Sequence, residues 1–227
     1  RRWWTNNSGV KEKMKRVAIC FWGQTRTDKG LEKCYKKLKS NNVQYDFFVS
    51  TWDDFENKSI FDFCVKKEFV TPDNLEFINN TDRASYLIHR VNSLKTQHEI
   101  QNNFIYDYVM WTRSEIVFDV DSLLNIIYSK LANCKDYEIN LHSADLKTDE
   151  DGQPYISADY YFLGTSLSFD LYSTGWKQYF KSKKWKNGKH GGHNYHAWIL
   201  SNLPFEIESI KPSHQFLCNK LKPREVR

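Results

Sequence analysis

Two acidic motifs lie close together near the middle of this 227-residue chain. The segment VMWTRSEIVFDVDS, residues 109–122, contains the pair Asp119 and Asp121 and, before it, the triplet Arg113-Ser-Glu115. Carboxylates at such a spacing can hold Mg²⁺ or Mn²⁺ against a diphosphate, because these ions prefer oxygen ligands. Which motif faces a ligand, and which only begins a helix, depends on the elements that surround them.

Two further polar segments follow strongly apolar runs. They are Gly23, Gln24, Thr25 and Arg26 after RVAICFW, and Thr51, Trp52 and Asp53 at the end of YDFFVSTWD. A glycine allows close approach of the backbone, the amide, hydroxyl and guanidinium groups donate to an anion, and the indole offers a stacking surface. The first segment alone is equally typical of an ordinary strand-to-helix turn, but two such segments at adjacent strand ends favour a nucleotide pocket.

Three histidines lie close together in the segment HGGHNYH, at His190, His193 and His196. A zinc site is a weak interpretation, because no cysteine or acid stands close by to complete four ligands. A neutral imidazole can instead act as a base near pH 7. The remaining alternative is that these side chains cap a helix or pack against it.

The elements that would position these residues alternate between strands and helices. Apolar periodicity predicts strands at residues 16–22, 45–51, 67–71, 106–118, 137–142 and 160–164, and helices at residues 29–40, 83–104, 122–131, 167–180 and 193–203. This order indicates an α/β fold with a mostly parallel central sheet flanked by helices, which binds ligands outside the carboxyl ends of its strands. We expect one domain over residues 16–227, preceded by a polar, irregular N-terminal extension or leader at residues 1–15.

Composition excludes several classes of function. The net charge of +5 is modest, and lysine and arginine are mixed with acidic residues, so no stripe of the kind that binds nucleic acid is present. No apolar run approaches the roughly 20 residues that span a bilayer, and the first residues lack a signal-peptide core. We therefore expect a cytoplasmic protein with no transmembrane segment. The five cysteines are odd in number and widely spaced, which favours buried free thiols.

Four blocks in combination resemble the landmarks of a GT-A-fold glycosyltransferase family found in polysaccharide gene clusters and in large viruses and phages. They are VAICFWGQTRT, YDFFVSTWDD, YDYVMWTRSEIVF and SADYYFLGTS, and the resemblance covers about residues 16–205. It implies a single GT-A-like (Rossmann-like) domain that transfers a hexosyl or deoxyhexosyl group from a nucleotide-diphosphate sugar donor to a glycan acceptor, with inversion. The base and ribose would lie after the first two strands and the diphosphate near the third block. A viral member would act in the host cytoplasm.

The resemblance also separates the two acidic motifs. It implies that Arg113-Ser-Glu115 occupies the usual Asp-x-Asp position, so that Glu115 would hold Mn²⁺ or Mg²⁺. Asp119 and Asp121 come later, directly before an apolar helical run, where an acid more often caps the helix. A surface ion pair between Arg113 and Glu115 is the alternative.

Metal dependence stays open, because the first expected aspartate of the motif is an arginine. The departing nucleoside diphosphate accumulates negative charge that a metal or fixed cations must stabilise. The cations that we expect to share this task with a metal, or to replace it, are Arg113, Arg26, Lys95 and the lysines from Lys181 to Lys189.

Asp159 and the last helix supply the candidate catalytic groups. The family pattern implies an aspartate at position 159 beside the donor sugar or acceptor, where it would orient hydroxyls or remove a proton; a turn-forming role is the alternative. Related transferases often carry an acidic base at the start of the last helix, and this chain offers His193, or His196, instead. A non-catalytic nucleotide-sugar or glycan-binding domain remains an alternative function. A kinase or methyltransferase is weaker, because no phosphate-binding glycine motif is present.

Overall fold

The computed structural model describes residues 3–5, 11–25, 35, 38, 43–54, 56–72, 75–114, 116, 120–131, 135–142, 146–156, 161–182, 190 and 192–210. The strands are β1 Trp3–Thr5, β2 Lys11–Lys13, β3 Lys15–Trp22, β4 Val43–Trp52, β5 Lys66–Val70, β6 Tyr108–Arg113, β7 Glu138–His142, β8 Leu146–Thr148, β9 Pro154–Ile156, β10 Tyr161–Gly164 and β11 Glu206–Ile210. The helices are the 3₁₀ turn η1 Lys58–Phe61, α2 Asn80–Asn102, α3 Val120–Leu131, α4 Ser166–Lys181 and α5 Gly192–Asn202.

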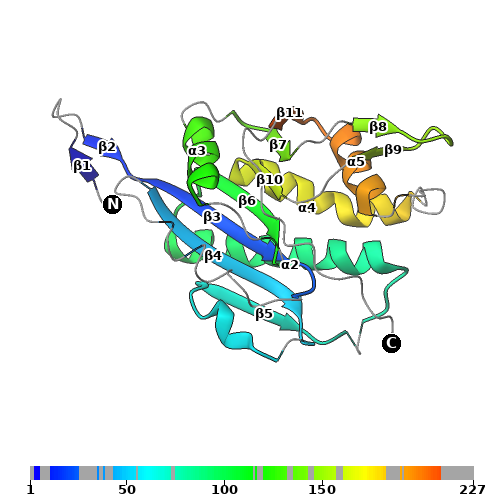
Figure 1. Cartoon of the computed structure of the whole chain (residues 1–227), viewed down its shortest axis with the longest axis horizontal. Helices are drawn as coiled ribbons and strands as arrows, with labels where there is room; N and C mark the ends of the chain where they lie inside the picture. The colour runs from blue at the N-terminus through cyan, green and yellow to red at the C-terminus, as the bar shows by residue number, and fades with distance from the viewer. Residues whose placement is uncertain are drawn as a thin grey trace.

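A seven-stranded sheet with the order β11-β7-β10-β6-β3-β4-β5 forms the centre of the molecule (Figure 1). Its neighbouring strands are parallel except at β10, which runs antiparallel to both β6 and β7. The expected α/β class with a mostly parallel sheet flanked by helices is therefore confirmed. After β3 the chain adds β4 and β5 on one side and then returns to place β6 on the other side of β3. Such a reversal of strand order is where open α/β sheets bind ligands, outside the carboxyl ends of the strands.

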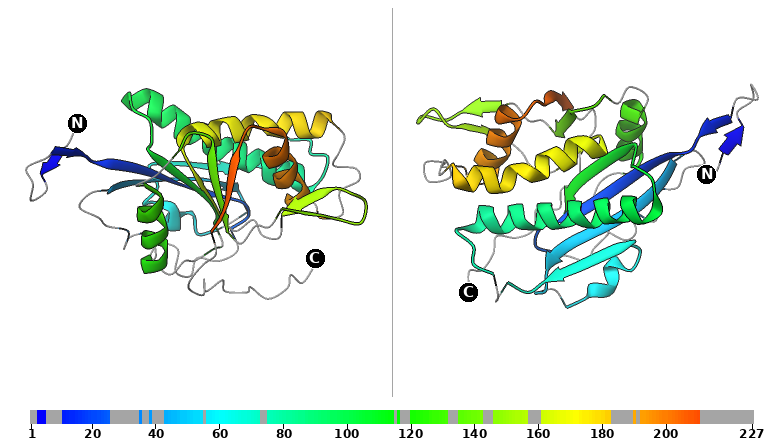
Figure 2. Two further views of the ribbon diagram at one scale, coloured as in Figure 1. Left: turned by 90° about the horizontal axis from the view of Figure 1, so that it is seen from above. Right: turned by 180° about the vertical axis from the view of Figure 1, so that it is seen from behind.

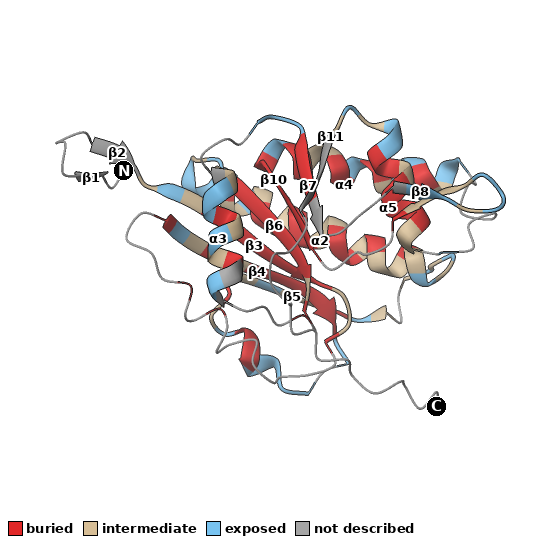
Figure 3. Cartoon of the chain, turned by 45° about the horizontal axis from the view of Figure 1, so that its top comes forward, coloured by how far each residue is buried: buried red, intermediate tan, exposed pale blue. Residues whose placement is uncertain are grey.

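The apolar run of β3 is buried on both faces of this sheet. Successive side chains of a strand point to opposite faces, so the run serves two cores. One core contains Val17, Ile19 and Phe21, and the other contains Ala18, Cys20 and Trp22. Both sets are almost completely buried, and Figure 3 shows the buried residues running the length of the central strands.

Helices cover the two faces unequally. The core that contains Cys20 is closed by α2, α4 and α5, whereas the opposite core is closed by η1 and α3 (Figure 2). Helix α2 begins at its cap Asn79, whose side chain accepts a hydrogen bond of 3.0 Å from the Asp82 amide. A side-chain cap of this kind fixes the first turn of the helix, and this turn lies near the carboxyl ends of the strands.

Most expected elements are present, with some differences. Strand β6 ends at Arg113 rather than near residue 118, because the Ile116 amide bonds back to the Arg113 carbonyl at 3.1 Å and turns the chain. Residues 1–15 were expected to be irregular, but β1 and β2 pair there as antiparallel strands. The β8–β9 pair and the edge strand β11 were also not expected. The helix expected at residues 29–40 falls mostly outside the described residues, of which Tyr35 and Leu38 are buried.

Within the part of the chain that the structure describes, no helix combines the length and the apolar character that crossing a membrane would require.

Candidate functional site

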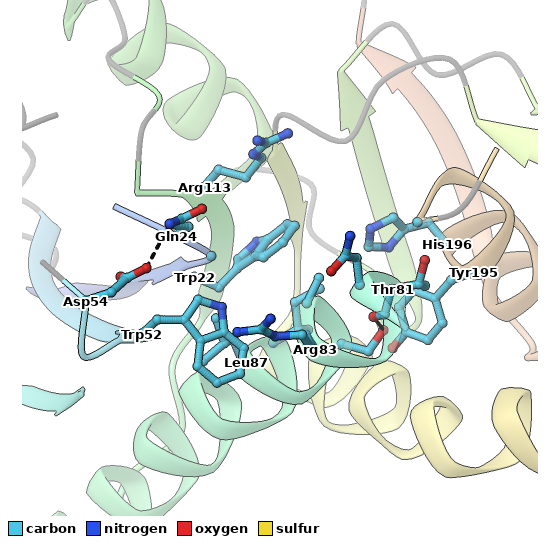
Figure 4. A pocket seen from close by; sticks show the side chains of 16 residues that line it. Trp22, Gln24, Trp52, Asp54, Thr81, Arg83, Leu87, Arg113, Tyr195 and His196 are labelled. Carbon is cyan, nitrogen blue, oxygen red and sulfur yellow. Dashed lines mark hydrogen bonds between the residues drawn. The ribbon is translucent and has the colours of Figure 1, made fainter. Parts of the chain in front are cut away.

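A cavity of about 320 Å³ lies at the carboxyl ends of β3, β4 and β6, where the strand order reverses (Figure 4). Its walls come from the loops after β3 and β4, the end of β6, the first turns of α2 and the start of α5. Pockets for small ligands in proteins commonly begin at about 300 Å³. The site therefore has the size and the place in the fold of a ligand pocket.

Buried hydroxyl groups join the three strand ends beneath the cavity. Thr25 Oγ1 lies 3.1 Å from Thr51 Oγ1 and donates to Ser114 Oγ at 3.1 Å, and Thr51 donates to the Gly23 carbonyl at 2.7 Å. Gly23 has a φ of +96°, a backbone conformation that glycine adopts without strain. The structure brings Gly23 to the cavity wall, and it places Thr25 and Thr51 in this supporting network rather than among the lining residues.

Gln24 and Asp54 face the cavity from adjacent loops. The Gln24 side-chain amide Nε2 donates to Asp54 Oδ2 at 2.7 Å. Asp53, which the sequence singled out, is not among the lining residues and forms an ion pair with Lys58. Both residues lie in the turn after β4, and this turn directs Asp54 rather than Asp53 toward the site.

Two indole rings, Trp22 and Trp52, form part of the wall. Trp52 was expected to be a loop residue available for stacking, but it ends β4 and is only 6% exposed. The ring stacks on Tyr86, with centroids 6.5 Å apart, and the Arg83 guanidinium lies 4.9 Å from its centroid. Figure 4 shows the Arg83 side chain extending from α2 toward the Trp52 ring. A ligand at this end would meet the planar guanidinium as well as the indole.

The charge of the described lining residues is predominantly positive. Arg83 and Arg113 are the cations, and Asp54 is the one carboxylate in this described set. Asn80 and Thr81 add the first turn of α2, which carries the positive end of the helix dipole. This arrangement suits an anionic ligand such as a diphosphate.

Of the two lining arginines, the sequence analysis identified Arg113 but missed Arg83. The sequence feature that could have identified Arg83 is an arginine in the first turn of a helix, where the helix dipole does not favour a cation.

Lys95 does not reach the cavity. Its side chain is completely buried in the middle of α2, where Nζ lies 3.1 Å from Glu99 Oε2 and 3.0 Å from Asp170 Oδ1 and also donates to Ser166. A buried ammonium requires such partners, because transfer from water is otherwise very costly. The expected role of Lys95 at the diphosphate is therefore corrected to one in the packing of α2 against α4.

The histidines of α5 have different partners. His193 Nδ1 lies 2.8 Å from the Ile156 carbonyl oxygen. A carbonyl only accepts, so Nδ1 carries the proton and Nε2 of the neutral ring is the proton acceptor. His193 itself is outside the described lining set, but its neighbour Gly192 belongs to it.

His196 does line the cavity, although it is only 2% exposed. Its Nδ1 lies 2.6 Å from the Tyr172 hydroxyl. The third ring, His190, stacks on Tyr155 with centroids 4.1 Å apart. The histidines thus contact separate groups rather than one centre. Within the described residues, no three histidine, cysteine or acidic side chains gather as a metal site.

Four of the residues expected from the sequence, Arg26, Glu115, Asp119 and Asp159, lie outside the described residues. Asp121 is exposed in the first turn of α3, which agrees with the expectation that it begins a helix. Asp54 is the one carboxylate in the described wall, and Glu115, the expected metal ligand, is not among the described residues, so the Mn²⁺ or Mg²⁺ site stays a prediction.

No protein-family model and no curated protein sequence matches the chain. Among solved structures, the chain is similar to 4-diphosphocytidyl-2C-methyl-D-erythritol synthase from Anaerococcus prevotii, with a TM-score of 0.49, 10% identity, and coverage of 91% of this chain and 93% of that chain. It is also similar to a glycosyltransferase involved in the glycosylation of the major capsid of PBCV-1, with a TM-score of 0.48, 10% identity, and coverage of 87% of this chain and 82% of that chain.

Proposed function

We propose that this chain is a GT-A-like glycosyltransferase that moves a sugar from a nucleotide-diphosphate sugar to a glycan hydroxyl, with inversion, in the cytoplasm. The observation that carries the proposal is the cavity at the reversal of strand order, with Arg83, Arg113 and the start of α2 in its wall. This is the place where α/β sheets bind nucleotides, and these groups are the kind that bind phosphates. The sequence blocks that resemble the family supply the reaction class.

The shape of the cavity suggests how the donor lies. Gln24, Asp54 and Trp52 form one end, beside the carboxyl ends of β3 and β4, and His196 of α5 forms the other (Figure 4). We place the nucleoside at the first end and the transferred sugar at the second. The diphosphate then lies near Arg83 and Arg113, which would stabilise the charge that develops on the leaving nucleoside diphosphate. A metal ion held by Glu115 would supply Lewis-acid stabilisation of the same charge.

We assign the role of base to His193. An inverting transfer requires a group that removes the proton of the acceptor hydroxyl as it attacks the sugar. The bond from His193 to the Ile156 carbonyl supports this role, because a neutral ring that donates from Nδ1 presents Nε2 as a proton acceptor. His196 is not fixed in the same way, since a tyrosine hydroxyl can either donate or accept. Asp159 is proposed to orient sugar hydroxyls, on the resemblance of its sequence block alone.

The test is a panel of nucleotide sugars, in which binding, hydrolysis and transfer are each measured with and without EDTA. We expect hydrolysis or transfer from one donor class. His193→Ala should lose this activity while donor binding remains. Tight binding with neither hydrolysis nor transfer to any tested glycan would favour a non-catalytic nucleotide-sugar-binding domain. Failure of every nucleotide and nucleotide sugar to bind would overturn the proposal.

A further inference from the structure

A second pocket, of about 380 Å³, lies between the last turns of α4 and the start of α2. These two helices lie side by side on one face of the sheet (Figure 2). The described residues that line the second pocket are Ile78, Asp82, Trp176, Lys177, Phe180 and Lys181. None of these six belongs to the described wall of the cavity at the strand ends, so the second pocket is a separate feature.

Asp82 holds the wall of the second pocket in place. Its side chain is only 7% exposed, and its Oδ1 accepts a hydrogen bond of 2.8 Å from Trp176 Nε1. Oδ2 accepts from the Ile78 amide at 3.0 Å. The Trp176 ring also contacts Tyr86 edge to face, with centroids 5.6 Å apart. The indole is therefore already oriented, so packing a ligand against it costs little side-chain entropy.

The charge that the second pocket presents to solvent is positive. Lys177 and Lys181 are exposed, stand one turn apart on α4 and form no ion pair with any described residue. Asp82, the one acid in the described lining set, has both oxygens occupied within the wall. Like charges at this spacing repel each other, and an anion bound between the two ammonium groups would relieve the repulsion.

The position of Lys181 corrects an expectation from the sequence. Lys181 was expected among the cations of the diphosphate, but it lines the second pocket and not the described wall of the cavity. The other lysines of residues 181–189 lie outside the described residues.

The second pocket suits a sugar ring that carries an acidic group. Two of its three apolar side chains are aromatic, and aromatic rings supply a large, rigid apolar surface on which the C–H face of a pyranose packs. The two lysines beside these rings supply cations for a carboxylate. A concave site of this size fits a discrete ligand rather than the flat surface of a membrane.

Only the first turn of α2 and one aromatic contact separate the second pocket from the cavity. Asp82 belongs to the second pocket, whereas its neighbours Thr81 and Arg83 line the cavity. Phe180 of the second pocket stacks on Tyr195 of the cavity wall, with ring centroids 6.5 Å apart. A glycan whose terminal hydroxyl reaches the cavity is therefore close enough to place another of its sugars in the second pocket.

We infer that the second pocket binds an acidic sugar of the acceptor glycan, with the sugar ring on the two aromatic side chains and the carboxylate between the two lysines. This inference rests on the proposed function and names its acceptor class, a glycan that contains uronic acids.

The experiment measures calorimetric binding of acidic tetrasaccharides, each against its carboxyl-reduced form, in which every carboxylate is replaced by a primary alcohol. Oligomannuronate, oligogalacturonate and hyaluronan tetrasaccharides are the probes. The two forms share their sugars and linkages, so their difference in affinity reports the charge. The acidic form of one or more probes is expected to bind about fivefold more tightly at low ionic strength, as two exposed ion pairs allow, and added salt should reduce the difference.

Variants of the lining residues connect this difference to the second pocket. Lys177→Gln/Lys181→Gln should remove it, and Phe180→Ala should weaken the binding of both forms. Lys135→Gln/Lys147→Gln is the matched control, because it removes the same charge from exposed lysines outside both described lining sets; it should keep the full difference. Nucleotide affinity should be the same in Lys177→Gln/Lys181→Gln as in the native chain, because neither lysine lines the cavity.

The outcomes separate this inference from the proposed function. Loss of the difference in Lys177→Gln/Lys181→Gln but not in the control supports the inference. The inference is overturned, and the proposed function stands, if no acidic glycan binds better than its reduced form, if the difference persists in Lys177→Gln/Lys181→Gln, or if that variant loses nucleotide affinity. If acidic glycans bind through the two lysines but no nucleotide or nucleotide sugar binds, the proposed function fails, and the acceptor role fails with it.

Discussion

Arg83 stands in the first turn of α2, where the helix dipole does not stabilise a cation. Its position is explained by the face of the Trp52 ring, which attracts the guanidinium at 4.9 Å, and by the cavity that it lines. A cation held against an aromatic ring is already oriented before a ligand arrives, so binding costs less side-chain entropy.

Replacing Arg83 by alanine should weaken the binding of nucleoside diphosphates at least tenfold, because a hydrogen bond to a charged group contributes about 1.5–3 kcal/mol. Stability should fall by only about 0.5–1 kcal/mol, the value of an accessible cation–π contact. Calorimetry and urea unfolding measure the two effects. Arg90→Ala is the control, because Arg90 pairs with Glu68 outside the described wall, and it should leave affinity unchanged. If the native chain and Arg83→Ala bound nucleoside diphosphates with equal affinity, this result would contradict the placement of the diphosphate beside Arg83.

The two acidic motifs of the sequence can be separated by a pair of variants. Glu115→Gln should lower turnover by orders of magnitude with little change in stability, if the resemblance places Glu115 correctly beside the donor. Asp121→Ala removes a favourable charge from the first turn of α3 and should cost about 0.3–1 kcal/mol while sparing most activity. Turnover that survives Glu115→Gln but is lost in Asp121→Ala would show that the later motif faces the ligand.

Between elements, the contact of α2 with α4 depends on a buried polar network. Lys95 and Glu99 of α2 meet Ser166 and Asp170 of α4, and Asn92 adds a hydrogen bond of 2.8 Å to Asp170. Glu99 also accepts from the backbone amide of Tyr106 at 2.8 Å, at the entry to β6. The network therefore stabilises the packing of α2 against α4 and against the entry to β6.

Lys95→Met should destabilise the chain by about 3–5 kcal/mol, because it leaves the buried carboxylate of Glu99 without its cation. Nucleotide affinity, measured under conditions where the variant is folded, should stay within a few-fold of the native value. Urea unfolding and calorimetry report the two quantities. Lys147→Met on the exposed strand β8 should change stability by no more than about 0.5 kcal/mol. If Lys95→Met instead lost affinity at unchanged stability, the lysine would belong to the diphosphate site after all.

At the scale of the whole molecule, helices and loops close both faces of the sheet, and a thiol lies in each of the two cores. Cys20 belongs to the core under α2, α4 and α5, and Cys64 belongs to the core on the opposite face. Burial raises the pKa of both thiols far above the ordinary value for cysteine. The thiolate is the reactive form, so both should be inert in the native state.

Alkylation followed by mass spectrometry checks this prediction at the level of individual cysteines. At pH 8, iodoacetamide should leave Cys20 and Cys64 unmodified in the native chain and modify both in urea. A thiol with a raised pKa is deprotonated only well above this pH, so both cysteines should stay protected from alkylation across the neutral range. Rapid native-state labelling of Cys20 alone would mean that the face under α2 opens readily. Labelling of Cys64 alone would point to the opposite face.

The main strands and helices follow from the sequence, because hydrophobic periodicity is a local property. The run RVAICFW specified a strand buried on both faces, and the segments after it and after YDFFVST were correctly placed at strand ends. The reversal of β10 was not predictable in this way. A run of four apolar residues has no direction, and its orientation is set by pairing with β6 and β7.

Only the tertiary structure decided which polar side chains meet at the cavity. Adjacent Asp53 and Asp54 are equivalent by type, and the turn after β4 directs one to Lys58 and the other to the site. Lys95 and Arg83 are both cations of α2, yet one lies on the face that packs against α4 and the other projects from the first turn. Residue type and spacing determine which element forms, whereas the direction of a side chain depends on packing partners that are distant in the sequence.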